Sequence, residues 1–397
     1  GGGAGGAGGA GGAGGRAGGR GARMGAAGAG ALEFEGAAEL RLRLVCSLLS
    51  GRAVRVGRIR AGEARPGLRE HEASLLRLLC KVSNGTVVQI NETGTALYFR
   101  PGILTGGAGL SHDCGRARAI GYFLEPLMLL APFSKKPVEC RLLGITNDDV
   151  DPSVDFFQRA GLPLLGRFGE EAAGTLKVLR RGFRPGGGGE VQVRLPVSKG
   201  LQQARIVDEG MVRRVRGIAY AGRTAAQNTN RLVDGARGVL NNLLADVYIF
   251  TDHMPKDKAG ESPGYGLTLV AETNSGLTLC AERCTRGFGE QCEGGSAAPE
   301  VPEDLGQACA KLLLEEVSRG GVVDSSFQGA LLLLCAVGQD TLHQVRLGPL
   351  TPHAVHVLRH IKDFFGVVFN LSPEQQSKTI FASCIGANVK NLAKGAR

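Results

Sequence analysis

The stretch from Arg181 to Val191 restricts the fold of this chain more than any other, because it contains four consecutive glycines. A glycine run accepts positive φ angles and lets another backbone approach closely, so it interrupts helices and strands. Two interpretations follow. The backbone N–H groups form an anion-binding nest beside the flanking arginines, or the glycines let the chain pass from one domain into another. The residues of this loop are Gly186, Gly187, Gly188 and Gly189.

On both sides of the loop, strand patterns alternate with helix patterns. Residues 53–59 alternate apolar and charged side chains, as a half-buried strand does. Residues 68–82 form an amphipathic pattern with leucines on one side. Residues 138–144 predict another strand, and residues 326–337 predict another helix. This alternation predicts an α/β (α+β) fold in which repeated units, each a sheet with two helices, form one large domain.

A different segment interrupts this large domain. It combines a long helix pattern at 225–244 with strand patterns at 191–195, 247–251 and 267–272. We expect a smaller inserted α/β domain at residues 187–290. The large domain then comprises residues 32–186 and 291–397.

Residues 1–31 consist almost wholly of Gly and Ala. Such small side chains bury too little apolar area to offset the entropy lost when a chain is ordered, so we expect a disordered tail. Met24 is a candidate native start, which would place residues 1–23 outside the native protein.

The chain is basic, with 47 Lys and Arg against 37 Asp and Glu and a net charge of +10. Basic proteins attract polyanions because phosphate neutralisation releases counterions. We therefore expect a role linked to nucleic acid, with a basic enzyme that has no such partner as the alternative. No apolar run is long enough to span a membrane.

The ten cysteines mostly stand alone in apolar surroundings, which predicts reduced, buried thiols in a cytosolic or nuclear protein. Cys280, Cys284 and Cys292 are the one cluster. Neither a close Cys pair nor a nearby His supplies a fourth ligand, so we expect no metal site.

Several motifs resemble the RNA 3′-terminal phosphate cyclase family. The family signature runs Arg-Gly, two residues, Pro, one residue, three Gly, one residue and an aliphatic side chain, which residues 181–191 match. Residues 59–68, 98–107 and 144–156 are similar to further family segments, so the resemblance extends from about Leu32 to Phe369. Residues 146–155, 250–254 and 347–350 are similar in particular to the non-cyclising branch of that family.

The resemblance also implies which groups a cyclase needs: a nucleophilic His, a metal-binding carboxylate and clamps for phosphate. Phe34 stands where the family has its acid, and Gly329-Ala330 where it has Asp-Gln. Residues 348–351, where the nucleophile belongs, contain no His, and Glu63 replaces a basic residue. We therefore expect no catalytic residue, no cofactor and no metal.

Three histidines follow directly: His353, His356 and His360. His356 and His360 have the i, i+4 spacing of one helix face, but no acidic partner or third ligand accompanies them in the sequence. With Lys362 or Asp363 they are the residues on which an alternative function, a pre-rRNA endonuclease, depends. An imidazole and a carboxylate within hydrogen-bonding distance inside the pocket would reopen the question of enzymatic activity.

By resemblance, the chain is a non-catalytic ribosome-assembly factor. The resemblance implies a nucleolar protein of the small-subunit processome that binds a ribosome-assembly GTPase, pre-rRNA or a pre-ribosomal particle and supports the cleavages that yield 18S rRNA. An active cyclase is the least favoured alternative. We expect the inherited pocket to persist as a basic surface for RNA or a partner. Its candidate residues are Arg41, Arg60, Arg65, Arg180, Arg181, Arg184, Arg213, Arg214 and Arg216.

Overall fold

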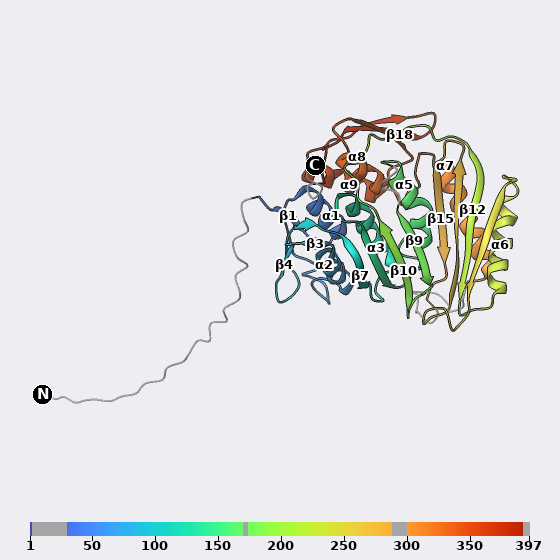
Figure 1. Cartoon of the computed structure of the whole chain (residues 1–397), viewed down its shortest axis with the longest axis horizontal. Coiled ribbons are helices and arrows are strands. Elements are labelled where there is room, and N and C mark those ends of the chain that lie inside the picture. Colours follow the sequence, from blue (N-terminus) through green and yellow to red (C-terminus); the bar gives the residue numbers. More distant parts are fainter. Residues whose placement is uncertain (2–29, 170–173, 288–299, 392–397) are drawn as a thin grey trace.

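The computed structural model describes residue 1 and residues 30–169, 174–287 and 300–391. Within these residues, helices cover four four-stranded sheets (Figure 1), which confirms the predicted fold class. The predicted disordered tail lies almost wholly outside the described residues. No described helix is both long and apolar enough to cross a membrane.

The first unit is a sheet with the order β1-β2-β5-β4. The pair β1–β2 is parallel, and β2–β5 and β4–β5 are antiparallel. A short two-stranded sheet, β3 with β6, lies beside it. The elements are β1 (Leu32–Glu35), α1 (Leu40–Ser50), β2 (Val54–Gly57), α2 (Glu70–Val82), β3 (Ser83–Asn84), β4 (Val87–Ile90), β5 (Leu97–Arg100) and β6 (Ile103–Leu104).

The second unit repeats the same order as β7-β8-β10-β9, again with one parallel pair followed by two antiparallel pairs. Its second helical segment consists of three short pieces, α4, a π-helical turn and α5. The elements are β7 (Gly107–Asp113), α3 (Ile120–Leu130), a 3₁₀ turn (Ala131–Phe133), β8 (Val138–Gly144), α4 (Val154–Phe156), the π-helical turn (Phe157–Gly161), α5 (Leu162–Gly166), β9 (Thr175–Arg180) and β10 (Gly189–Leu195).

The third unit has the order β11-β16-β18-β17 with the same pattern of pairings. Each unit therefore has strand order first, second, fourth, third, which confirms the predicted repetition. The elements are β11 (Arg205–Ile206), α8 (Gln328–Val337), β16 (Leu342–Leu347), α9 (Pro352–Phe365), β17 (Asn370–Glu374) and β18 (Thr379–Ile385).

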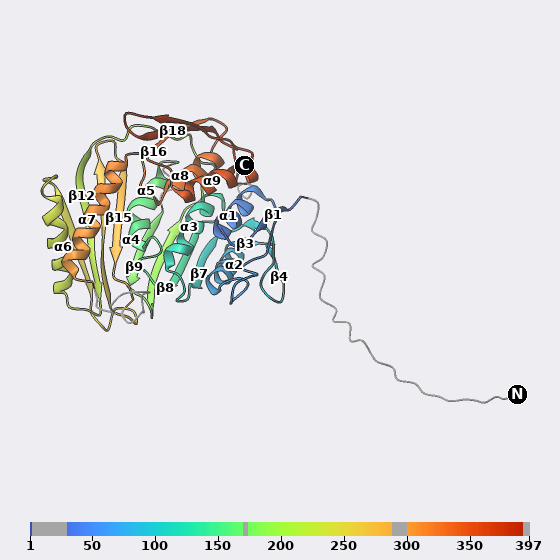
Figure 2. The same cartoon turned by 180° about the vertical axis from the view of Figure 1, so that it is seen from behind.

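The inserted unit interrupts the third unit between β11 and α8. Its sheet has a different order, β13-β12-β14-β15, and its two helices cover one face of that sheet (Figures 1 and 2). The elements are β12 (Val212–Gly222), α6 (Gln227–Leu240), β13 (Val247–Met254), β14 (Gly264–Thr273), β15 (Thr278–Cys284) and α7 (Pro302–Arg319).

These pairings differ from the predicted boundaries of the insert, 187–290. The strand predicted at its start, β10, hydrogen-bonds to β8 and β9 in the second unit. Helix α7, predicted in the large domain, packs its apolar side with α6 and β14 in a separate core. The local pattern of a strand or a helix does not determine which sheet it joins. The sequence therefore placed both β10 and α7 on the wrong side of the boundary.

The cores follow the predicted periodicities. Val54 and Val56 of β2 are buried, and so are Leu75, Leu78 and Leu79 of α2. One continuous core runs through the three units, and the inserted unit has its own. A small third cluster of Phe183, Tyr220 and Cys284 joins the second unit to the insert.

Candidate functional site

The glycine loop lies at the junction between the second unit and the insert. The N–H of Gly186 donates to Ser262 Oγ at 2.8 Å, and the N–H of Gly187 donates to the Phe183 carbonyl at 2.8 Å. The N–H of Gly260 donates in turn to the Arg181 carbonyl at 2.7 Å. An added Cβ at Gly260 would overlap the carbonyl oxygen of Gly187. Protein atoms thus already accept from Gly186 and Gly187. The loop joins β9 to β10 within the second unit, so the interpretation that it carries the chain into another domain is wrong; the glycines instead let the loop pack closely against the insert.

Arg181 is 1% exposed and fully engaged inside the protein. Its guanidinium bonds both oxygens of Asp155, at 2.7 and 2.9 Å, and its Nε donates to Asp252 at 2.6 Å. The guanidinium also lies 4.7 Å from the centre of the Tyr220 ring. Burial alone would lower the pKa of Arg181, but Asp155 and Asp252 outweigh it and raise that pKa.

The expectation that Arg181 lines a binding surface is therefore wrong. Two carboxylates, one on α4 and one on β13, neutralise it and exclude it from solvent. It connects the second unit to the insert. Arg184 is similarly engaged, with Nε 2.9 Å from Asp148 Oδ2 and Nη2 donating to the Ala117 carbonyl. Arg180, at the end of β9, is exposed.

Two of the candidate arginines of the first unit form ion pairs with carboxylates. Arg41 bonds Glu125 at 2.5 Å, and its guanidinium lies 4.8 Å from the Tyr122 ring centre. Arg60 bonds both oxygens of Glu72, at 2.8 and 2.7 Å. The side chain of Arg65 is exposed. These carboxylates thus neutralise much of the positive charge of this surface.

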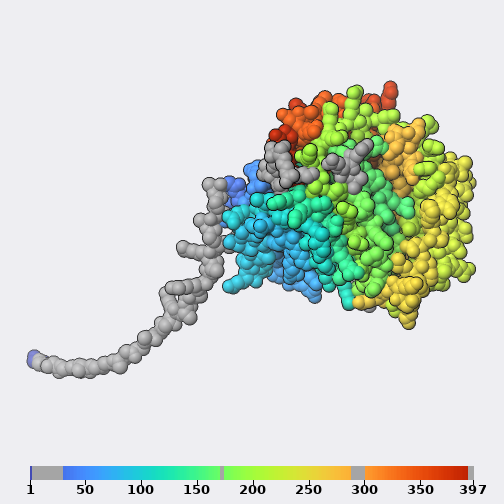
Figure 3. Space-filling view, viewed as in Figure 1, coloured from blue at the N-terminus to red at the C-terminus, as the bar shows by residue number. Residues whose placement is uncertain are grey.

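The remaining candidates lie on β12. Arg214 bonds Glu272 at 2.7 Å, Arg216 bonds Asp246 at 2.7 Å, and Arg213 is exposed. The first unit and the insert lie at opposite ends of the molecule, as Figures 1 and 3 show. The nine arginines therefore do not form one basic cleft, contrary to our expectation.

His353, at the start of α9, has an acidic partner that the sequence did not indicate. Its Nδ1 lies 3.1 Å from Glu39 Oε2, although 314 residues separate the two in the chain. The hydrogen bond to Glu39 raises the pKa of His353, and the same bond lowers the pKa of Glu39. Glu39 adopts φ 54°, a left-handed conformation that non-glycine residues rarely adopt.

This pair places an imidazole and a carboxylate within hydrogen-bonding distance, which is the distance part of the condition for reopening the question of enzymatic activity. It also shows that one of the three histidines has an acidic partner. The other two histidines behave differently. His356 is exposed. His360 is buried against the ring of Phe34 at 5.3 Å, and burial lowers its pKa to about 4.

The positions that the resemblance assigns to cyclase chemistry hold other groups. Phe34 stacks on Phe364 with ring centres 5.8 Å apart, and the Arg43 guanidinium lies 4.5 Å from the Phe34 ring centre. Gly329 on α8 lies directly against the His353 ring, where a Cβ would be 3.0 Å from Nε2. Thus an aromatic cluster lies where the family has its acid, and a glycine without a side chain lies where the family has Asp-Gln.

A buried carboxylate that sequence reasoning missed lies between the second unit and the insert. Glu282 on β15 accepts from the backbone N–H and hydroxyl of Ser153 and from Thr268 Oγ1. Burial raises the pKa of Glu282 to about 8. It lines a cavity of about 240 Å³ together with Asp148 and Asp151. In the sequence, only the resemblance of residues 151–155 to a family segment pointed to this region.

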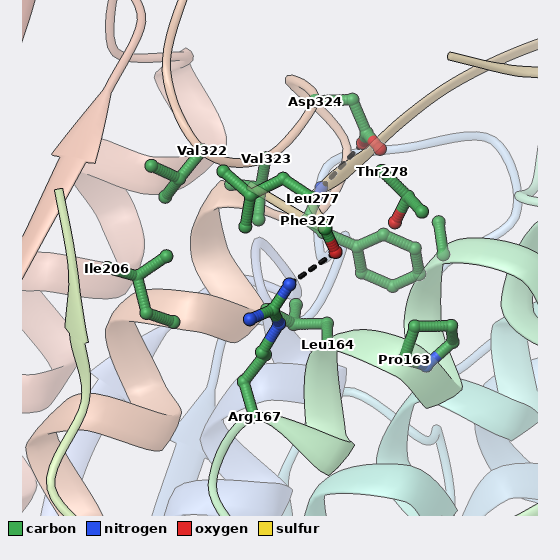
Figure 4. A pocket seen from close by; sticks show the side chains of 12 residues that line it. Pro163, Leu164, Arg167, Ile206, Leu277, Thr278, Val322, Val323, Asp324 and Phe327 are labelled. Atoms are coloured by element: carbon green, nitrogen blue, oxygen red, sulfur yellow. Dashed lines mark hydrogen bonds between the residues drawn. The ribbon is translucent and has the colours of Figure 1, made fainter. Parts of the chain in front are cut away.

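A second cavity lies where α5, β11 and the β14–β15 turn meet (Figure 4). Its lining is mainly apolar, and Arg167 crosses it to donate to the carbonyl oxygen of Gly276. We assign it to packing between units. Within the described residues, no group of His, Cys, Asp and Glu side chains is placed to hold a metal, and Cys292 lies outside them.

Comparison with known proteins agrees with the motifs. The model of the RNA 3′-terminal phosphate cyclase family matches residues 32–371. A Mus musculus protein named RNA 3′-terminal phosphate cyclase-like protein is 48% identical over 93% of this chain and 99% of its own length. A probable protein of that name from Dictyostelium discoideum is 44% identical over 91% and 99%.

The rRNA processing protein rcl1 of Schizosaccharomyces pombe is 41% identical over 90% of this chain and 96% of its own length. The family model runs from the first unit through the insert into the third unit, so the resemblance is confirmed. This chain belongs to the RNA 3′-terminal phosphate cyclase family.

Proposed function

We propose that this chain is a pre-rRNA processing factor that acts by binding and does not cyclise RNA ends. The observation that carries the proposal is the packing of Phe34 between Phe364 and His360, at the position of the family's acid. A ring in that place offers neither a metal ligand nor a proton carrier. The relative from fission yeast, named for rRNA processing, supports the same direction.

The finer proposal is a nucleolar protein of the small-subunit processome that supports 18S rRNA maturation. Its partners are a ribosome-assembly GTPase and the pre-rRNA or pre-ribosomal particle. The net charge of +10 supports an anionic partner. In this proposal the protein positions its partners, and another component of the particle cleaves the RNA.

Two experiments test this function. Incubation of the purified protein with ATP labelled in the α-phosphate should leave no covalent AMP, and a labelled protein band would overturn the non-cyclising assignment. In fission yeast depleted of its relative, expression of this chain should restore 18S rRNA levels. Persistent accumulation of 18S precursors, with the protein present at normal abundance, would contradict the processing role.

The Glu39–His353 pair favours a second candidate, an endonuclease. In this reaction the RNA 2′-oxygen attacks the adjacent phosphorus and gives its proton to water, and the bond to the 5′-oxygen breaks. A protonated imidazole oriented by a carboxylate supplies the proton for that leaving 5′-oxygen. In buffer containing EDTA, the purified protein would cut a pre-rRNA fragment, and His353→Ala and Glu39→Gln would each reduce the rate at least a hundredfold. An uncut fragment after prolonged incubation eliminates this candidate and leaves the binding function.

A further inference from the structure

Two aromatic side chains on the insert are exposed to solvent. Tyr248 and Phe250 are 50% and 48% exposed, and their ring centres lie 4.6 Å apart. They alternate along β13, so both project from the same face of the sheet. A pair of neighbouring exposed rings is unusual where no ligand covers them, because burying aromatic area is favourable.

The face that carries these rings is the one that α6 and α7 leave uncovered. Ile249, between the two rings in sequence, packs in the core with both helices. Arg216 pairs with Tyr248 across the strands, and Ile218 pairs with Phe250. We call Arg216, Ile218, Tyr248 and Phe250 the aromatic face.

The body of the three units covers the β14–β15 part of this side of the sheet, where Val270 and Cys280 are buried in its core. Further along the same strands, Tyr220 packs on Phe183 and under Arg181. Asp252, two residues after Phe250, bonds Arg181. Ile218 packs at the margin of this cover, and the two rings on the edge strand β13 are the part of the aromatic face that stays exposed.

Basic residues lie near both ends of the aromatic face, although Arg214 and Arg216 among them are paired with Glu272 and Asp246. Asp246, which bonds Arg216, has its pKa lowered by that hydrogen bond and also by the charges of Arg214 and Arg213, so three arginines lie near one carboxylate. At the other end, Arg180 directly precedes Arg181, whose backbone N–H contacts Met254 on β13. Among the described residues, neither Arg180 nor Arg213 forms an ion pair.

Exposed rings on a sheet between unpaired arginines fit single-stranded RNA better than other ligands. Unpaired bases stack on aromatic side chains whatever their sequence, and phosphates bind the flanking cations. Duplex RNA hides its bases within the stack, and an acidic peptide would use the arginines but not the rings.

We propose that the aromatic face binds a short stretch of single-stranded RNA, with bases on Tyr248 and Phe250 and phosphates on Arg180 and Arg213. The proposal rests on the pre-rRNA function above and assigns it an RNA-contacting surface. It places that surface on the insert, away from the Glu39–His353 pair (Figure 1).

The test measures fluorescence anisotropy of a labelled 12-nucleotide single-stranded RNA with the full chain. Tyr248→Ala with Phe250→Ala should weaken binding about tenfold or more, since each stacked base contributes about 1–3 kcal/mol. Tyr248→Phe should keep the affinity, because it retains the ring. Ile90→Ala with Ile103→Ala, which removes exposed apolar side chains of the first unit, is the matched control and should stay within about twofold.

Charge reversal tests the phosphate contacts. Arg180→Glu with Arg213→Glu should weaken binding and make it less sensitive to salt, whereas Arg100→Glu, an exposed arginine on β5, should change little. A thermal melt of each variant checks folding. Unchanged RNA affinity in the folded double-alanine variant overturns the proposal, and so does loss of a protein partner with RNA affinity intact.

The two proposals fail in different ways. If the double-alanine variant binds RNA normally while the chain still restores 18S rRNA, the aromatic face is wrong and the processing function stands. If the variant loses RNA but the wild-type chain never restores 18S rRNA, the processing function is wrong and the surface stands.

Discussion

At the scale of single residues, an arginine can contact a ligand only if carboxylates do not already enclose and neutralise it. Arg181 has the residue type expected of an RNA contact, but Asp155 and Asp252 enclose it. Exposed Arg180, its neighbour in sequence, keeps its charge available to solvent. Residue type therefore predicted positive charge correctly, while burial decided which charges reach a ligand.

Removing the Arg181 guanidinium should destabilise the protein strongly. Arg181→Met leaves the Asp155 carboxylate buried without its cation, and such a change costs about 3–5 kcal/mol. Urea denaturation of the variant measures the loss of unfolding free energy. A loss below about 1 kcal/mol would show that Asp155 does not depend on this pair.

Glu282 should make stability depend on pH. Its pKa is about 8 in the folded protein against 4.5 for the ordinary side chain, so between these values the folded state binds the extra proton. Stability then falls as pH rises from about 5 to 8, by at most about 1.4 kcal/mol per pH unit. Unfolding midpoints of Glu282→Gln across this range should fall less steeply than those of the wild type. Equal slopes would contradict the raised pKa.

At the scale of elements, the glycine loop acts as a joint between units. Its N–H groups and carbonyls bond the segment 260–262. The sequence left open an anion nest or a passage of the chain into another domain, and the structure shows instead a loop within the second unit that packs on the insert. The choice depended on which backbone lies over the loop, and no local pattern contains that information.

Two glycine substitutions separate close packing from ordinary chain flexibility. Gly260→Ala should destabilise the protein, because the new methyl group would overlap the Gly187 carbonyl oxygen. Gly238→Ala on α6 meets no atom within 4 Å and should stabilise the helix by about 0.5–1 kcal/mol. Thermal melts of the two variants should shift in opposite directions. A shift of the same sign in both would remove the packing argument.

At the scale of the whole molecule, three units with one strand order form the body, and the insert interrupts the third of them. The Glu39–His353 contact connects the first unit to the third. Because this contact raises the pKa of His353 and lowers that of Glu39, its stabilisation is fully present between about pH 4.5 and 6.5. It is lost as pH rises through the folded pKa of His353 and as pH falls through the folded pKa of Glu39.

NMR titration of the His353 ring checks this contact. Its pKa in the wild type should lie above the ordinary value of 6.5, because the Glu39 carboxylate stabilises the protonated ring. Glu39→Gln should lower the His353 pKa, and it should leave that of His360, which is low through burial, almost unchanged. An unaltered His353 titration in the variant would show that the two side chains do not interact.

The sequence by itself determined the fold class, the repeated units and the family. These depend on periodicity and motifs, which are properties of neighbouring residues. Only the tertiary structure decided that His353 meets Glu39, that Arg181 is neutralised and that Tyr248 and Phe250 are exposed. Such outcomes depend on contacts between segments distant in the chain, and on which part of a sheet another unit covers.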